Sequence, residues 1–150
     1  MLLVLSTLPH FFTPYALYPF DVKGVSFFSY AATALLSTCA SIEWHYNGEP
    51  EDYRMYMVHS LFVLWAIQEL IYSAIVHYRL FAFSSVLNLT TLVLNQYITT
   101  LDKPSYNVYH AAWHTLSAFK CYIIASLIYR GFSKKYSKGK ENKEAFDSVL

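Results

Sequence analysis

Charged residues are scarce in this sequence. Asp, Glu, Lys and Arg make up 14% of its 150 residues, which is about half of their share in an ordinary soluble domain. Hydrophobic residues make up 55% and aromatic residues 19%. Long linkers and low-complexity stretches are also missing, so the chain has room for one domain. Composition alone would still allow a soluble domain with a large core, and the distribution of the apolar residues argues against that.

The sequence also has few cysteines. Cys39 and Cys121 both lie within apolar runs, and neither their spacing nor their position indicates a disulfide or a thiolate metal cluster. The apolar N-terminus lacks the basic region and the small-residue cleavage site of a signal peptide. We therefore interpret it as a retained first membrane span.

Five segments approach the roughly 20 apolar residues that a helix needs to cross a bilayer. They are residues 2–18, 25–44, 55–76, 80–100 and 108–129. Pro9 and Pro14 interrupt the first segment, but neighbouring helices can satisfy the backbone groups that a proline frees. The sequence thus predicts an all-α, multi-pass bundle over residues 1–129 and a basic, flexible tail over residues 130–150. The alternative is a four-span bundle in which residues 1–18 lie in the membrane interface.

The charges between these segments predict an orientation. Glu49, Glu51 and Asp52 make the connection between the second and third segments acidic, whereas Lys23 and Arg79 lie in the two neighbouring connections. The tail is basic, with Arg130, Lys134, Lys135, Lys138, Lys140 and Lys143. Because basic loops stay in the cytoplasm, we predict a cytoplasmic tail and an N-terminus outside. We interpret the basic cluster as an anchor near anionic lipid and not as a nucleic-acid site.

Histidines recur where the second segment ends and the last begins. His110 and His114 are four residues apart and share one helix face, which is the spacing that lets two imidazoles bind one metal ion. The predicted topology places His45 at the same outer depth, with Ser41 one turn away. Three histidines and a water are a common catalytic zinc constellation. We predict a zinc site at His45, His110 and His114; interfacial histidines bonded to headgroups or backbone are the alternative.

These motifs resemble the CREST superfamily of membrane proteins, which includes alkaline ceramidases, progestin and adipoQ receptors, post-GPI-attachment proteins and myomaker. The resemblance rests on Ser41-x-x-x-His45 and on His110-Ala-Ala-Trp-His114. The aromatic residue before the second histidine, and Asn47-Gly48 after His45, are most similar to the last two of these members. The resemblance implies that the three histidines bind zinc and that Ser41 supplies a nearby hydroxyl, as in a hydrolase of lipid amide or ester bonds.

Two features depart from that family. The family has seven spans and this chain has about five, so the resemblance covers the first three helices and the last. The family also has an aspartate early in its third helix, where this sequence has His59 and Ser60. His59 would lie at the right depth to replace that acid–base group or to be a fourth metal ligand. Four protein ligands would make a closed, structural site.

A third group of polar residues is expected near mid-membrane. Glu69 and Lys120 lie at similar depths in the third and fifth segments, and Asn88 lies at a similar depth in the fourth. Because an isolated charge at this depth costs several kcal/mol, we predict that these three residues form one polar layer, with a structural role or a role in a proton path.

Three functions remain open at this point. One is a zinc-dependent lipid hydrolase; the second is a non-catalytic scaffold or membrane-remodelling protein of the same fold. Both place the chain in an endomembrane or the plasma membrane with lipids as partners. The third is a small subunit of a larger complex in the mitochondrial inner membrane. There, His45 or His59 and His110 or His114 would bind haem b from facing helices. None of the three involves nucleic acid.

Overall fold

The computed structural model describes residues 1–17, 21–22 and 25–147. It confirms the all-α class. The elements, in chain order, are α1 (Leu2–Thr7), the 3-10 helices η1 (Leu8–Phe12) and η2 (Pro14–Leu17), the short strands β1 (Asp21–Val22) and β2 (Val25–Ser26), and the long helices α2 (Phe28–Tyr46), α3 (Tyr53–Val76), α4 (Tyr78–Ile98) and α5 (Lys103–Asp147). The two strands form an antiparallel pair. Lys23, used in the topology prediction, lies outside the described residues.

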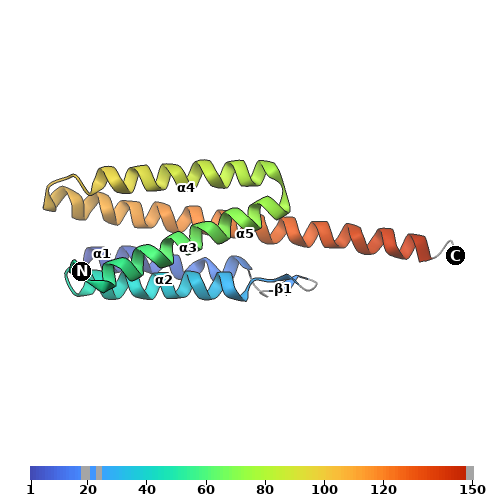
Figure 1. Cartoon of the computed structure of the whole chain (residues 1–150), viewed down its shortest axis with the longest axis horizontal. Helices are drawn as coiled ribbons and strands as arrows, with labels where there is room; N and C mark the ends of the chain where they lie inside the picture. The colour runs from blue at the N-terminus through green and yellow to red at the C-terminus, as the bar shows by residue number, and fades with distance from the viewer. Residues whose placement is uncertain (18–20, 23–24, 148–150) are drawn as a thin grey trace.

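The long helices run up and down a bundle with two distinct ends (Figure 1). At one end, which we call the histidine end, α2 passes to α3 and α4 passes to α5. At the other, the basic end, the single residue His77 joins α3 to α4 in an extended conformation. The N-terminus lies at the histidine end, and α5 projects past the basic end (Figure 1).

Two helices are long and apolar enough to cross a membrane, namely α3 and residues 103–139 of α5. The structure thus supports two helices that could span a membrane, and the count of five spans stays a prediction. Helices α2 and α4 have 19 and 21 residues, which is long enough, but their serines, threonines and asparagines make them more polar. The first segment is a shorter apolar helical stretch, residues 2–17, because its prolines divide it into α1 and two 3-10 turns.

The bundle exposes many apolar side chains and buries several polar ones. Val63, Ile67 and Ile71 form an exposed stripe along α3, and only 17% of the most apolar stretch of α3 is buried. Buried positions include Ser73 of α3 and Ser84 of α4, whose hydroxyls are hydrogen-bonded to each other at 2.9 Å. The core helix of a soluble protein would bury its aliphatic face, so this distribution is typical of helices surrounded by lipid.

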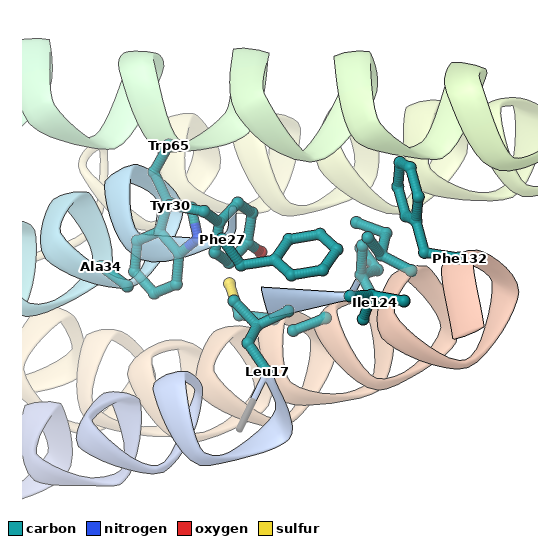
Figure 2. Packing of buried hydrophobic residues seen from close by; sticks show 11 residues of the cluster. Leu17, Phe27, Tyr30, Ala34, Trp65, Ile124 and Phe132 are labelled. Atoms are coloured by element: carbon teal, nitrogen blue, oxygen red, sulfur yellow. The ribbon is translucent and has the colours of Figure 1, made fainter. Parts of the chain in front are cut away.

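Apolar packing concentrates toward the basic end (Figure 2). Phe27, just before α2, is fully buried, and its ring centroid lies 5.3 Å from those of Tyr72 on α3 and Phe132 on α5. Ile124 and Leu17 complete the same cluster. These contacts join the start of α2 to α3 and α5 and to the end of the N-terminal segment.

The structure brings Glu69, Lys120 and Asn88 together beneath the histidine end. Lys120 Nζ donates to a Glu69 carboxylate oxygen at 3.0 Å and to the Asn88 amide oxygen at 2.9 Å. The Asn88 amide and the Tyr30 hydroxyl also donate to Glu69. The Glu69 side chain is fully buried, so these donors replace the water that its charge would otherwise require.

Helix α5 continues without interruption to Asp147. The boundary that we predicted at residue 130, between the bundle and a flexible tail, therefore does not coincide with the end of a helix. Lys134, Lys135 and Lys138 are exposed on this last part of α5.

Helices α3 and α5 approach each other closely at Gly131. A β-carbon at this position would collide with the γ-carbons of Val76, the last residue of α3. Because Val76 is β-branched, it has few rotamers by which to move aside. The position therefore requires glycine, although glycine weakens a helix.

We predict that Gly131→Ala destabilises the protein by about 1–3 kcal/mol, since it overpacks this contact. Gly139→Ala is the matched control, because nothing lies within 4 Å of a β-carbon there and alanine is the better helix former. Thermal unfolding of the purified protein in detergent would measure both variants. Equal midpoints for the two variants would contradict the proposed contact.

Candidate metal centre

Three buried histidines meet at the histidine end of the bundle. His45 is the penultimate residue of α2, and His110 and His114 lie on successive turns of α5. The helices supply the spacing: α5 places two imidazoles on one face, and the antiparallel α2 ends at the same height. Each of the three residues is at least 92% buried.

The imidazole nitrogens are close enough to hold one metal ion. One ring nitrogen from each histidine lies within 4.8 Å of the other two, and His45 Nε2 is 2.8 Å from His114 Nε2. Two facing lone pairs repel at that distance, so a proton or a metal ion must lie between them. A tetrahedral zinc ion with Zn–N bonds of about 2.0–2.1 Å would hold its nitrogen ligands roughly 3.3 Å apart, which small side-chain rotations would achieve.

A ring nitrogen of His110 that has no hydrogen-bond partner also supports the binding of a metal ion by these residues. His110 Nδ1 is buried and has no hydrogen-bond partner among the described residues. Leaving a buried polar atom unsatisfied costs about 1–3 kcal/mol, and a bound cation would remove that cost for a ring nitrogen. Neutral imidazoles suit zinc, and they also suit copper, iron and nickel, so the ligand set is compatible with a metal without identifying it.

Haem b fits this arrangement less well. Two axial histidines bind opposite faces of the macrocycle, which must therefore stand between their nitrogens. The nitrogens of His45 and His114 are in direct contact, and His59, the other proposed axial ligand, is exposed and outside the cluster. The geometry favours a single metal ion.

The turn after α2 brings a carboxylate to His45. Gly48 and Glu49 both adopt positive φ angles, 82° and 59°, and their N–H groups donate to the His45 and Trp44 carbonyls. This pattern is a Schellman motif, in which the chain turns back at a helix C-terminus. It places Glu49 Oε1 at 3.0 Å from His45 Nδ1.

Glu49 is ionised in this position. Burial raises the pKa of its carboxyl group, but hydrogen bonds from His45 and Lys103, together with the positive charge of Lys103, outweigh that effect and lower the pKa to about 2. An ionised carboxylate only accepts hydrogen bonds. His45 Nδ1 must therefore carry the proton, and His45 Nε2 is left with the lone pair that a metal needs.

A cavity of about 130 Å³ adjoins the histidines and lies between α2, α3, α4 and α5. Ser41 lines it, and its hydroxyl has no hydrogen-bond partner among the described residues; the hydroxyl of Thr38, by contrast, bonds to the Ala34 carbonyl. Val63 of α3 and Leu92 of α4 line the cavity and are also exposed on the outside of the bundle. The cavity lining thus includes exposed apolar side chains from both of these helices.

Two further histidines line the cavity outside the three-nitrogen cluster. His59 of α3 is exposed and packs 6.2 Å, between ring centroids, from Trp44. His10 of η1 is buried, with Nδ1 at 3.1 Å from the Thr7 carbonyl and its ring 5.9 Å from that of His114. His59 and Ser41, the predicted catalytic residues, thus share one cavity with the predicted ligands.

Comparison with protein-family models, with curated proteins and with solved structures found no match.

Sequence reasoning missed two contributors to this site. The sequence-based prediction gives His10 no role at this site. Its position as the single histidine of the apolar segment 2–18 is the signal that could have indicated one. We treated Glu49 only as part of an acidic loop. Its spacing of four residues from His45, with Gly48 between them as a helix-stopping residue, is the signal that could have found it.

We predict that the purified protein binds one zinc ion and that His114→Ala abolishes this binding, since it removes the ligand that contacts His45. His59→Ala, which alters the same cavity outside the cluster, should keep the metal. Elemental analysis and an absorption spectrum would measure this. Equal zinc content in the wild type and His114→Ala would refute the site, and a Soret band would indicate haem instead.

Proposed function

We propose that this chain is an integral membrane protein of five spans that binds zinc at its outer end and hydrolyses an amide or ester bond of a membrane lipid. The observation that carries the proposal is the buried cluster of His45, His110 and His114 beside a cavity lined largely by apolar side chains.

The distribution of charge supports the orientation. Glu43, Asp52 and Arg54 form an ion-pair group at the histidine end, and Arg79 together with the tail lysines lies at the basic end. Under the positive-inside rule, the basic end is cytoplasmic and the N-terminus outside. Residues 2–17 pack against α5 and α2 and would be the first, short span; if they lay in the interface, the bundle would have four.

The cavity supports a lipid substrate. Its apolar walls include Val58, Phe62 and Val63 of α3 and Leu92 of α4, and the exposed Val63 and Leu92 side chains would face hydrocarbon in a membrane. An acyl chain could enter there without leaving the bilayer. The carbonyl group that follows it would then lie near Ser41 and the three histidines.

The side chains have distinct roles in this proposal. Zinc, when bound, supplies a water of lowered pKa and polarises a carbonyl group. Ser41 donates its unpartnered hydroxyl to the oxygen of that carbonyl as negative charge develops. His59, in the same cavity and outside the cluster, is the group available for proton transfer in place of the missing aspartate. The resemblance to the CREST superfamily supports this reaction class.

A second candidate is a zinc-stabilised scaffold with no catalytic activity. It is favoured by the absence of the family's aspartate early in the third helix, where Ser60 and His59 stand. In this alternative the metal only ties α2 to α5.

We predict that a cysteine introduced by Glu51→Cys reacts with a membrane-impermeant maleimide in intact cells, whereas one introduced by Lys138→Cys reacts only after permeabilisation. The wild type is the control for the native cysteines, of which Cys121 is buried and Cys39 is exposed in the middle of α2. An N-terminal epitope tag should be accessible from outside. Access to the tag only from the cytoplasm would support four spans, and reaction of both cysteines from one side would refute the topology.

We predict that wild-type protein in lipid vesicles hydrolyses one class among ceramides, glycerolipids and related lipids, and that His114→Ala abolishes this activity. Ser41→Ala should lower the rate about 10²-fold, the usual effect of losing an oxyanion donor. Ser85→Ala is the matched control, because its hydroxyl is bonded to the Phe81 carbonyl on an exposed face. Bound zinc without hydrolysis of any lipid would support the scaffold instead.

A further inference from the structure

The turn that presents Glu49 to His45 is held in a conformation that glutamate disfavours. Of its two left-handed residues, Gly48 adopts a positive φ without steric cost, but Glu49 at φ 59° does not. A non-glycine residue keeps such a conformation only where the surrounding contacts impose it, and such residues concentrate at functional sites. The contacts of the Glu49 carboxylate therefore impose this backbone conformation.

Both oxygens of that carboxylate are occupied. Oε1 accepts hydrogen bonds from His45 Nδ1 at 3.0 Å and from the Tyr106 hydroxyl at 3.4 Å, and Oε2 accepts one from Lys103 Nζ at 2.9 Å. The side chain is only 11% exposed. Lys103 and Tyr106 belong to the first turn of α5, so Glu49 joins the two helices that supply the three histidines.

The direction of these hydrogen bonds determines the tautomer of His45. Its Nδ1–H points at Glu49, away from the cluster, and its Nε2 faces His114 at 2.8 Å. Histidines that bind metals are commonly held in this way, with the second ring nitrogen donating to a carboxylate. We propose that Glu49 is the positioning residue of the metal centre: it fixes the tautomer and the ring orientation of His45, and Lys103 and Tyr106 hold it in place. The inference rests on the proposed zinc site and adds to it a residue outside the ligand set.

Glycine at position 49 separates the metal role from the structural one. Because Gly adopts a positive φ more easily than Glu, relief of this strain should offset part of the stability lost with the carboxylate contacts, and metal-free Glu49→Gly should remain folded. The same variant should weaken zinc affinity 10- to 100-fold, the usual effect of removing such a partner. Glu49→Gln, which keeps an acceptor for Nδ1–H, should restore part of the affinity. Glu51→Ala, which removes a charge from the same loop, should change neither property.

Two spectroscopic readouts complete the test on the full-length protein. In the metal-free state, ¹⁵N-histidine NMR should show His45 protonated at Nδ1 in the wild type and a mixture of tautomers in Glu49→Gly. At saturating Co²⁺, the visible spectra of the two proteins should match, since the ligands are the same. A changed Co²⁺ spectrum would make Glu49 a ligand and overturn the positioning role.

The remaining outcomes are distinguishable. Zinc binding by Glu49→Gly with wild-type affinity would overturn this inference and leave the metal site intact. Failure of the wild-type protein to bind zinc would overturn the proposed function and the inference together.

Discussion

Polar side chains buried in this bundle have to find their partners inside it, because a buried polar group without a partner is costly. That constraint accounts for the arrangement of the helices. Glu69 is fully buried and takes hydrogen bonds from Lys120, Tyr30 and Asn88, which come from three other helices. The partners cannot meet unless the four helices stand in one register. The outer positions, exemplified by Ile67, are aliphatic, and the polar contacts add to the apolar core in specifying the fold.

Helix α5 takes part in several of the contacts that set this register. It carries His110 and His114 at one end, Lys120 near the middle and Gly131 toward the other end. The Gly131 contact lets α3 and α5 approach closely, and the Lys120 bond to Glu69 sets their relative height. Once those two contacts are fixed, His114 has to lie level with the end of α2. The metal centre thus depends on packing that lies several turns away from it.

The sequence predicts well those contacts that depend only on how far each residue lies along its helix. Counting residues from the helix ends places Glu69 level with Lys120, and an up-and-down topology places His45 level with His110; the structure brings both pairs together. Features that depend on contacts between distant segments could not be predicted from the sequence. The conformation of Glu49 is imposed partly by Lys103, 54 residues away, and local propensity does not favour it. The position of His10 follows from a 3-10 path between two prolines, which an apolar pattern does not specify.

The charged groups are arranged along the bundle axis in an order that is consistent with the cost of burying charge. The layer at mid-bundle is a paired carboxylate and ammonium, Glu69 and Lys120, which together carry no net charge. A divalent ion held by three neutral imidazoles would keep both of its charges, and burying it deeply would cost far more. The histidine cluster lies instead within the last turn of α2, next to the Glu49 carboxylate and within reach of the exposed Lys103 side chain. A site near the helix ends allows water and a carboxylate to screen the ion. The same site would be unfavourable at the depth of Glu69.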